Sequence, residues 1–382
     1  MSRSVLWAND FPPVTSGIAT YFVNLWRHLP PDRVAVIAPR LPGAAEIDRT
    51  LPFPVRRVWL PLGESAVVKG VKTLLTILRA LLLCVTERPA RFHCGQVFSS
   101  GIAGLAGHKL CGIPYVVYVY GSETVRLGQG GLARRLMQAV LRESERVVAC
   151  STFTASEFVE FGVNGDHILV VYPGVDTDRF RPGEPDRELV DRFQLDGKYV
   201  LLTVARLDER KGHDTVIRAL AALGAEGERF VYLIVGKGRE EARLRRLADD
   251  LGLRDRVVFA GYVPDADLPR YYTLCTVFVM PNRMTTQTAL AGDIEGFGIS
   301  FIEASACGKP VIAGRSGGAQ EAVVDEETGL LVDPESPDAV AAALLRVFRD
   351  PDFARRLGEA GRRRAEAEYD WRRLAKRVEE IL

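Results

Sequence analysis

Two glutamates, Glu295 and Glu303, stand eight residues apart in a stretch that also contains Gly296 and Gly298. The apolar run after these glycines is typical of the first turns of a helix, and Val311 begins a short buried strand. The first backbone N–H groups of a helix have no partner within it, and together with the helix dipole they attract anions. Gly298 has no Cβ, so a phosphate can approach the backbone there. The pattern favours a phosphate-binding helix start with an acid on either side.

The two acids have different expected roles. Glu303, on the first or second turn of the helix, can accept hydrogen bonds from ribose hydroxyls, as the acidic residue of a dinucleotide fold does. Glu295 lies on the loop side, where a sugar hydroxyl or the reacting centre would be. The alternative is that Glu295 caps the helix and Glu303 is a solvated helix residue. The glycines and the apolar helix beside them weigh against this alternative.

A cationic loop follows the predicted strand 199–204 and includes Arg206 and Lys211, five residues apart. Arg206 can bind phosphate oxygens through its guanidinium fork, and Lys211 can act as a point charge. Both are therefore candidates to bind the diphosphate of a nucleotide. Taken singly, either would pass as an ordinary surface cation.

Further glycines and charges follow neighbouring strands. Gly236 begins a G-x-G after the strand 230–235, which is a weak signal by itself and does not complete a dinucleotide fingerprint. Val263 follows the strand 257–260, where its backbone can face a base edge. The stretch 293–298 follows the strand 277–280, and Arg315 and Gly317 follow the strand 311–313. Five successive strand ends thus carry glycines or charges, which indicates a ligand site at the strand-order reversal of a parallel sheet.

The composition describes a packed globular chain of 382 residues, enough for two domains, with 47% hydrophobic residues and a net charge of +1. We expect no nucleic-acid partner. Two D-x-D sequences, 176–178 and 265–267, are better explained by a turn and a helix cap, so we expect no metal cofactor. The cysteines lack C-x-x-C spacing and are interpreted as buried hydrophobes in a reducing compartment: Cys84, Cys94, Cys111, Cys150, Cys275 and Cys307.

Strands and helices alternate through both halves of the chain, which predicts an α/β protein with two Rossmann-like, doubly wound domains. The predicted domains are residues 1–172 and 173–365, with a C-terminal helix at 366–382 that packs back on the first domain. The predicted strands of the first domain are 4–8, 34–38, 55–60, 97–100, 115–120, 146–151 and 168–172. Those of the second are 199–204, 230–235, 257–260, 277–280, 311–313 and 329–332.

One long helix, predicted at 67–85, has apolar residues at helical spacing and several nearby lysines and arginines. Packing of its wide apolar face against the sheet is the commoner explanation. The alternative is a basic amphipathic helix that lies on an anionic membrane surface. No apolar run is long enough to span a bilayer and no signal peptide is evident, so we expect a cytoplasmic protein, with the inner face of the cell membrane as its potential contact.

The stretch 295–303 resembles the E-x7-E motif of retaining glycosyltransferase family four, which has the GT-B fold. The resemblance covers essentially the whole chain and is most specific in the second domain. It includes residues 171–180, 206–212, 261–264 and 304–312. Residues 9–13 and 281–283 are most similar to GDP-mannose-dependent enzymes, the branch that includes the phosphatidylinositol mannoside mannosyltransferases.

The resemblance implies two domains facing across a cleft that holds a nucleotide sugar, with the acceptor on the first domain. It implies that Arg206 and Lys211 hold the diphosphate, that Glu303 binds the ribose and that Glu295 contacts the donor sugar. It also places the amides of Gly298 and Ile299 on sugar or phosphate oxygens. Gly17, in the loop after the first strand, would close over the diphosphate.

The chain departs from the family pattern at Tyr120, which stands where an H-G-x-E stretch often has histidine. A phenol can hydrogen-bond a sugar hydroxyl, but at its ordinary pKa it is a poor general base. Residues 16 and 17 read Ser-Gly where the family often has Gly-Gly. Both departures bear on the identity of the donor sugar and of the acceptor.

These observations predict a retaining hexosyltransferase that transfers mannose from GDP-mannose to a glycolipid, a polyprenyl-linked sugar or another glycan acceptor. The resemblance implies front-face attack without a metal or a protein nucleophile, the leaving phosphate taking the acceptor proton. The runner-up is the same chemistry with UDP-glucose or UDP-N-acetylglucosamine. A sugar-nucleotide 2-epimerase and a non-catalytic nucleotide-binding protein are the alternatives from other classes.

Overall fold

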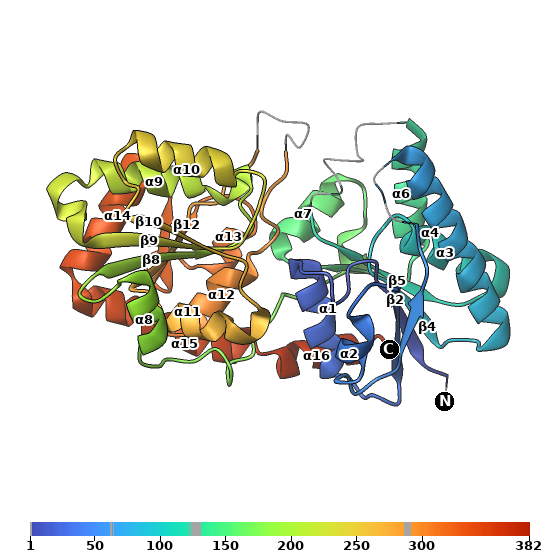
Figure 1. The fold of residues 1–382 in the computed structure, drawn as a ribbon. Coiled ribbons are helices and arrows are strands. Elements are labelled where there is room, and N and C mark those ends of the chain that lie inside the picture. The colour runs from blue at the N-terminus through green and yellow to red at the C-terminus, as the bar shows by residue number, and fades with distance from the viewer. Residues whose placement is uncertain (1, 62, 64, 122, 124–130, 286–291) are drawn as a thin grey trace. The chain divides into compact units, whose positions relative to one another are not determined.

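The computed structural model describes residues 2–61, 63, 65–121, 123, 131–285 and 292–382. The chain divides into two compact units (Figure 1), and we describe each by itself. The first unit consists of Met1–Gly174 together with Trp371–Leu382, and the second of Val175–Asp370.

The first unit has a sheet whose strands, in the order β3-β2-β1-β4-β5-β6-β7, are all parallel to their neighbours. Its described strands and helices are β1 (Ser4–Trp7), α1 (Gly17–Arg27), β2 (Val34–Pro39), α2 (Ala44–Asp48), β3 (Val55–Val58), α3 (Ala66–Thr86), β4 (Arg91–Cys94), α4 (Ser100–Cys111), β5 (Tyr115–Val119), α6 (Gly131–Glu143), β6 (Arg146–Ala149), α7 (Thr152–Glu160), β7 (Ile168–Val170) and α16 (Trp371–Glu379).

Two hydrophobic cores cover the two faces of this sheet. One joins the sheet to α3, α4, α6 and α7, and the other joins it to α1 and α16. Trp371 of α16 packs edge-on against Tyr21 of α1, with 5.9 Å between the ring centroids. Because both faces are covered, strands such as β2 and β5 are apolar along their length instead of alternating.

The second unit has a parallel sheet in the order β10-β9-β8-β11-β12-β13. Its described strands and helices are α8 (Arg187–Phe193), β8 (Tyr199–Val204), α9 (His213–Ala222), β9 (Phe230–Val235), α10 (Glu241–Asp250), β10 (Val257–Gly261), α11 (Leu268–Leu274), β11 (Val277–Met280), α12 (Ile299–Ala306), β12 (Val311–Gly314), α13 (Ala319–Ala322), β13 (Gly329–Val332), α14 (Pro337–Arg349) and α15 (Pro351–Glu368).

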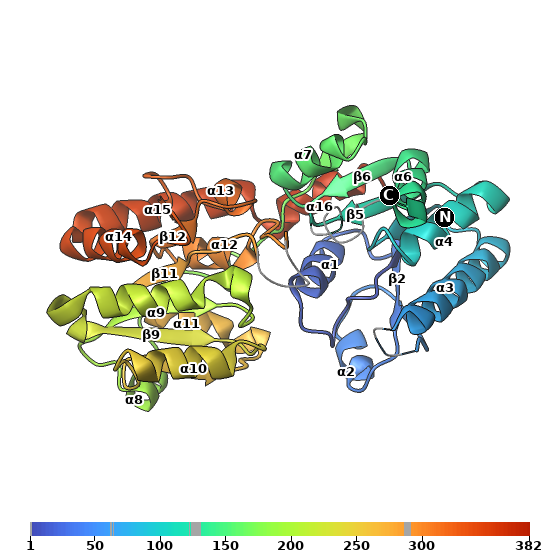
Figure 2. The same ribbon diagram turned by 90° about the horizontal axis from the view of Figure 1, so that it is seen from above.

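The helices of the second unit are distributed over both faces of its sheet. Helices α9 and α10 lie on one side and α8, α11 and α12 on the other (Figure 1). Seen from above, α14 and α15 lie next to each other beside β12 (Figure 2). Both units therefore have the doubly wound α/β architecture that the alternating pattern predicts.

Two predicted elements were wrong. The fourth strand of the first unit is β4 at Arg91–Cys94, whereas Val97 lies in the turn before α4. The prediction missed β4 because Arg91 and His93 interrupt its apolar pattern. The C-terminal helix predicted at 366–382 begins later, because residues up to Glu368 belong to α15, the chain leaves that helix at Tyr369, and Asp370 forms a β-bridge with Val175 before α16 starts at Trp371.

Helix α3 packs one side into the core of the first unit but leaves much of its wide apolar face exposed, so packing against the sheet explains only part of that face. We call this row of six side chains, which are between 44% and 77% exposed, the α3 stripe: Val67, Val71, Leu74, Leu78, Leu82 and Val85. The opposite side of α3, with Thr76, Ala80, Leu83 and Cys84, is the buried one. Helix α4 packs alongside α3 (Figure 1).

Candidate active site

The candidate site of the second unit lies where its strand order reverses, between β8 and β11. These two strands pair directly, Leu201 with Val277 and Leu202 with Phe278. The chain leaves β8 toward β9 and leaves β11 toward β12, in opposite directions across the sheet. The loops that follow β8 and β11 therefore emerge side by side at the carboxyl edge, where α/β sheets bind their ligands.

A buried ion cluster joins these two loops. Glu295, which is 8% exposed, accepts hydrogen bonds from Arg210 Nη1 and Lys211 Nζ. Arg210 Nε also lies 3.5 Å from Asp293 Oδ2. Both cations come from a 3-10 turn at Glu209–Lys211, which follows β8. The cluster therefore fixes the loop after β11 to the loop after β8.

The cluster determines which of its groups are charged. Burial by itself raises the pKa of Glu295, but the charges and hydrogen bonds of Arg210 and Lys211 outweigh burial and hold it at about 2. Burial, reinforced by the charge of Arg210, lowers the pKa of Lys211 to about 8, although Glu295 acts against this shift. At neutral pH the glutamate is thus a carboxylate and the lysine is mostly protonated.

Arg206, the other predicted phosphate ligand, is placed differently from Lys211. Its side chain is 64% exposed and pairs with Asp208 at 2.9 Å. The backbone beside it is fixed by His213, whose Nε2 lies 3.3 Å from the Arg206 carbonyl and whose Nδ1 lies 2.9 Å from the Tyr232 hydroxyl. Burial lowers the pKa of His213 to about 4, so this histidine is neutral at physiological pH.

The start of α12 provides the predicted helix N-terminus. Gly298 is its N-cap residue, with φ +95°, and no side chain caps the helix. A Cβ at this position would lie 2.5 Å from the Phe301 ring, so only glycine fits without rearrangement. Ile299 is the first helical residue, and its amide belongs to the group that a helix cannot pair internally. The alternative that Glu295 caps this helix is therefore wrong.

Glu303 lies on the second turn of α12 and is 7% exposed, so it is not a solvated helix residue. Its Oε2 accepts a hydrogen bond of 2.6 Å from the Tyr272 hydroxyl. Burial raises the pKa of Glu303 to about 7, and Asp265 adds to this increase, whereas the Tyr272 hydrogen bond opposes it. The carboxyl group therefore titrates near neutral pH.

Gly236 and Val263 complete the predicted donor residues of this unit. Gly236 has φ +136°, and a Cβ there would lie 1.9 Å from the Ala205 carbonyl oxygen. The G-x-G after β9 thus exists because two strand-end loops touch backbone to backbone. Val263 follows β10 and is 8% exposed.

Three side chains of this edge were not given a role by the sequence. Arg210 was within the predicted cationic loop, but nothing in the loop indicates that its partner is Glu295. Asn282, fully buried, donates to the Ser316 carbonyl at 3.0 Å and accepts from the Gly314 amide at 3.2 Å. Arg283 binds Asp214 through two contacts of 3.0 Å. For Asn282 and Arg283, the only signal in the sequence was the resemblance of residues 281–283 to a family segment.

Tyr120 and Gly17 lie in the first unit. Tyr120 follows β5 and donates its hydroxyl proton to the Gly95 carbonyl at 3.0 Å. Burial, together with neighbouring acidic groups, raises its pKa, so the phenol is not a base at neutral pH. Gly17 is the exposed first residue of α1, and Ser16 caps that helix by accepting from the Ala19 amide at 3.1 Å.

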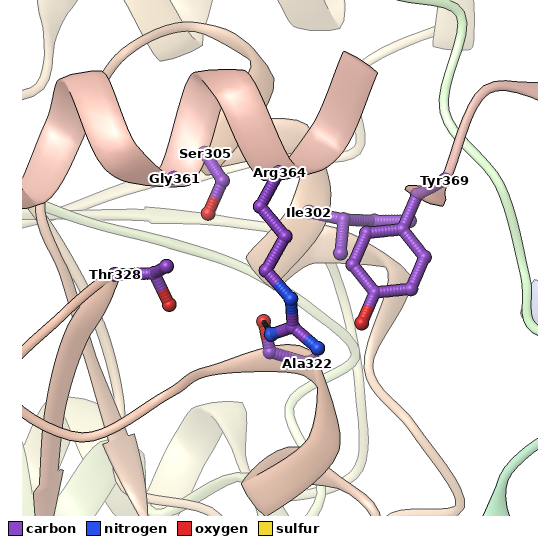
Figure 3. A pocket seen from close by; sticks show the side chains of 7 residues that line it. All are labelled: Ile302, Ser305, Ala322, Thr328, Gly361, Arg364 and Tyr369. Atoms are coloured by element: carbon purple, nitrogen blue, oxygen red, sulfur yellow. Dashed lines mark hydrogen bonds between the residues drawn. The ribbon is translucent and has the colours of Figure 1, made fainter. Parts of the chain in front are cut away.

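A small internal space behind α12 does not belong to the candidate site. Figure 3 shows the seven residues that line it: Ile302, Ser305, Ala322, Thr328, Gly361, Arg364 and Tyr369. Arg364 bridges it by donating to the Ala322 carbonyl at 3.4 Å. Ile302 and Ser305 lie on a face of α12 turned away from Glu303, because helical residues one or two apart point in different directions.

Among the described residues there is no group of three or more histidine, cysteine, aspartate or glutamate side chains arranged to hold a metal ion. In the same residues, no helix is both long enough and apolar enough to cross a membrane.

Comparisons with known proteins agree with this architecture. Residues 15–179 match the family model described as Glycosyltransferase Family 4, and residues 186–364 match the model described as Glycosyl transferases group 1. A Mycobacterium tuberculosis protein named GDP-mannose-dependent alpha-(1-6)-phosphatidylinositol monomannoside mannosyltransferase is 35% identical, covering 100% of this chain and 98% of the relative. A Corynebacterium glutamicum enzyme for the monoacylated form is 31% identical, covering 100% and 97%.

Solved structures support the fold. Anabaena HepE, in complex with UDP and glucose, matches with a TM-score of 0.82 and 19% identity, covering 100% of this chain and 99% of HepE. Sucrose-phosphate synthase from Thermosynechococcus elongatus has the same TM-score and 22% identity, covering 100% and 98%. The predicted GT-B fold and the predicted family are both confirmed. The chain is a hexosyltransferase that belongs to glycosyltransferase family four, alongside GDP-mannose-dependent mannosyltransferases that act on phosphatidylinositol mannosides.

Proposed function

We propose that the enzyme transfers mannose from GDP-mannose to a glycolipid acceptor of the phosphatidylinositol mannoside class, with retention at the anomeric carbon. The names of the relatives support the donor and the acceptor class. The observation that carries the donor site is the buried cluster of Glu295, Arg210 and Lys211 next to the open N-terminus of α12.

In this proposal the second unit, residues 173–365 in the sequence-based division, binds the donor. Lys211 and the amides of Gly298 and Ile299 contact the diphosphate, because a protonated amine and unpaired N–H groups both favour an anion. Arg206 swings from Asp208 to the outer phosphate oxygens. Glu303 accepts hydrogen bonds from the ribose.

The base and the donor sugar have separate contacts. Gly236 and Val263 border the nucleoside through their backbones, and Glu295 accepts a hydrogen bond from a hydroxyl of the donor sugar. The first unit binds the acceptor with help from Tyr120 and supplies Gly17 toward the diphosphate. Helix α16 at the C-terminal end of the chain packs on the core of this unit.

The chemistry in this proposal needs no protein nucleophile. The bond from the anomeric carbon to the phosphate oxygen breaks, and the acceptor oxygen bonds the same face of that carbon. The acceptor proton passes to the leaving phosphate. Arg210 and Lys211 both donate hydrogen bonds to Glu295, and its lowered pKa makes it a weak base. It is therefore suited to orient a hydroxyl group and unsuited to attack carbon. Lys211 and the α12 amides stabilise the charge of the departing diphosphate without a metal.

The α3 stripe supports a contact with the membrane that carries such an acceptor. Six exposed apolar side chains form one face of α3, and Lys72 and Arg79 lie along one flank of this face by helical spacing. Trp59 is 61% exposed and lies beside Arg79. The Arg79 guanidinium donates a hydrogen bond of 2.6 Å to the backbone carbonyl of Trp59. We propose that α3 rests on the anionic inner face of the cell membrane.

Pelleting with vesicles tests the membrane contact. We expect the protein to sediment with vesicles containing anionic lipid at low salt, and Leu74→Ser with Leu78→Ser to reduce the bound fraction. Leu251→Ser, at an apolar position on the second unit that is 36% exposed, is the control and should bind like the parent. Equal binding of the stripe variant and the parent would remove α3 from the membrane contact.

A thermal-shift panel with GDP, UDP, ADP and their sugars tests the donor. A ligand at one hundred times its Kd should stabilise the protein by about 2.7 kcal/mol. A shift with GDP and GDP-mannose supports the proposal, and a shift confined to UDP species moves the donor to UDP-glucose or UDP-N-acetylglucosamine. Isomerisation of the nucleotide sugar without any acceptor would instead identify a 2-epimerase.

A further inference from the structure

Two cysteines meet at neighbouring helix ends in the first unit. Cys84 is buried in α3, two residues before that helix ends, and Cys111 is the exposed last residue of α4. The two helices pack alongside each other. This exposure corrects the prediction that all six cysteines are buried. Only Cys111 is exposed among the six, all of which lie in the described residues.

The packing of α3 on α4 brings the two thiols together. A Cβ on Gly107 of α4 would lie 3.2 Å from Cys84 Sγ, so Cys84 points at the face of α4 that carries Gly107. Cys111 is one helical turn further along the same face, because residues four apart on a helix are neighbours. Cys111 is close enough to Cys84 to act on its thiol, because it contributes to raising the pKa of Cys84.

The end of α4 leaves room for the small movement that a covalent bond requires. A disulfide holds its sulfurs about 2.05 Å apart, closer than any hydrogen bond. Gly112 follows Cys111 with φ +72°, and no atom lies within 4 Å of the place where its Cβ would be. The chain directly after Cys111 is therefore not held by a packed neighbour at this position.

We propose that Cys84 and Cys111 are a reversible redox pair, which a peroxide converts to a disulfide linking α3 to α4. The Cys111 thiolate attacks one peroxide oxygen and the O–O bond breaks. Cys111 becomes a sulfenic acid, and the hydroxide that departs takes up the proton that the Cys111 thiol lost and becomes water. Cys84 Sγ then attacks the Cys111 sulfur, the S–O bond breaks, and the hydroxyl group leaves as water with the Cys84 proton. Two thiols and one hydrogen peroxide thus give one disulfide and two waters.

Exposure sets the order of these two steps. Cys111 is open to a dissolved oxidant, whereas Cys84 is 2% exposed. Burial raises the pKa of Cys84 to about 12, and the neighbouring Cys111 adds to this increase. Cys84 is therefore a protonated thiol that an oxidant does not reach, and it reacts only with an oxidised sulfur beside it.

The remaining cysteines provide an internal comparison. Cys94, Cys150, Cys275 and Cys307 are all buried. A dissolved oxidant can therefore reach Cys111 but none of these four cysteines. The proposal is therefore specific for one pair, and both of its members belong to the first unit.

Mass spectrometry of the full-length protein tests the pair. The reduced protein is treated with hydrogen peroxide, free thiols are alkylated, and the mass and peptide map are recorded without reductant. We expect the loss of two hydrogen atoms and a linked peptide containing Cys84 and Cys111, both reversed by a thiol reductant. Cys111→Ser should abolish this product, and Cys84→Ser should leave Cys111 as a sulfenic acid that a dimedone probe captures.

Cys150→Ser is the matched control, because a hydroxyl can keep the 3.4 Å contact that Cys150 Sγ makes with Thr154 Oγ1. It should form the Cys84–Cys111 link like the parent. The proposal is overturned if Cys111 is oxidised in the folded parent without any link to Cys84. It is also overturned if the link forms only after the protein is unfolded. A melting curve of each variant shows whether the fold is retained. The proposal also requires that iodoacetamide labels Cys111 but not Cys84 in the folded parent.

Discussion

The two sheets reverse their strand order at equivalent places, between β1 and β4 in the first unit and between β8 and β11 in the second, yet the chemistry at the two edges differs. At the second edge, Glu295 is buried between Arg210 and Lys211. At the first edge, Asn9 donates to the Ser99 hydroxyl at 2.8 Å and Tyr120 donates to the Gly95 carbonyl at 3.0 Å.

This difference separates what the fold provides from what the side chains provide. A reversal of strand order creates a ligand edge in both units, whatever residues follow the strands. Buried charges suit a diphosphate, which arrives with its own charge, whereas neutral donors and acceptors suit the hydroxyls of an acceptor sugar. We therefore expect changes at the two edges to affect the two substrates separately.

The largest effect is expected from Glu295→Gln. If Glu295 orients the donor sugar, its loss should lower kcat by about 10²–10³, the cost of removing one preorganised group that acts in the transition state. Two buried cations also lose their counter-charge, so the melting temperature should fall. Turnover of GDP-mannose, measured below both melting transitions, checks the prediction. Glu209→Gln, in the adjoining 3-10 turn, is the control, and near-parental turnover of Glu295→Gln would contradict the assignment.

Lys211→Met and Arg206→Met rank the two predicted phosphate ligands. A buried hydrogen bond to a charged group contributes about 1.5–3 kcal/mol, so Lys211→Met should weaken GDP binding by about 10- to 100-fold. Arg206 is 64% exposed, and its removal should weaken binding only a few-fold. Calorimetric titration with GDP measures both values. A larger loss with Arg206→Met would reverse the ranking.

The titration of Glu303 should make the affinity for GDP depend on pH, an effect that belongs to the second edge alone. Its pKa is raised to about 7, so if Glu303 binds the ribose as proposed, the ribose meets a neutral carboxyl group at acidic pH and a carboxylate above neutrality. Because charged acceptors make the stronger hydrogen bonds, GDP affinity should increase several-fold from about pH 6 to about pH 8. In Glu303→Gln this increase should be absent, whereas an equal increase there would assign it to another group.

The same group makes a prediction for stability. A raised pKa means that the folded state holds the proton more tightly than the unfolded state does. The stabilisation from protonated Glu303 is therefore fully present below its ordinary value of 4.5 and is lost as the pH rises through about 7. Denaturant titrations between these values should show a steeper fall in unfolding free energy for the parent than for Glu303→Gln. Parallel curves would contradict the shifted pKa.

Tyr120→Phe should have the smallest effect and should act on the other substrate. It removes a hydrogen bond to the Gly95 carbonyl, typically about 1 kcal/mol, and leaves the ring in place. The acceptor KM should rise a few-fold while the Kd for GDP stays unchanged. A change in the Kd for GDP would show that the two edges do not act separately.

The sequence was sufficient to predict most of the framework. Strands such as 199–204, 230–235 and 277–280 are continuous apolar runs, since both faces of a parallel sheet are covered, and their bounds were predicted without error. The strand at Arg91–Cys94 was missed because its side chains include an arginine and a histidine. His93 is fully buried there, with Nδ1 3.0 Å from the Tyr118 hydroxyl, a partner that local pattern does not reveal.

The candidate site was predictable in its parts but not in its pairings. Glycine spacing and the E-x7-E resemblance indicated Glu295, Gly298 and Glu303 as candidates, and their assignment stays a prediction. The partnership of Glu295 with Arg210 joins residues 85 positions apart in sequence, and the Glu303–Tyr272 bond joins residues 31 apart. Such contacts depend on which strands become neighbours. The same applies to α3, whose helical spacing was evident although the sequence did not show which face lies open.

The glycine contacts at the second edge restrict how this enzyme can change its specificity. A Cβ at Gly236, Gly314 or Gly318 would lie within about 2 Å of a backbone carbonyl oxygen, so these positions accept no other residue while the loops stay packed. Drift and laboratory selection alike must therefore act through side chains with free space, such as Tyr262, which is 52% exposed next to Val263. If Val263 borders the nucleoside as proposed, a mutant library that varies Tyr262 and keeps the three glycines constant would sample new nucleotide preferences while most variants still fold.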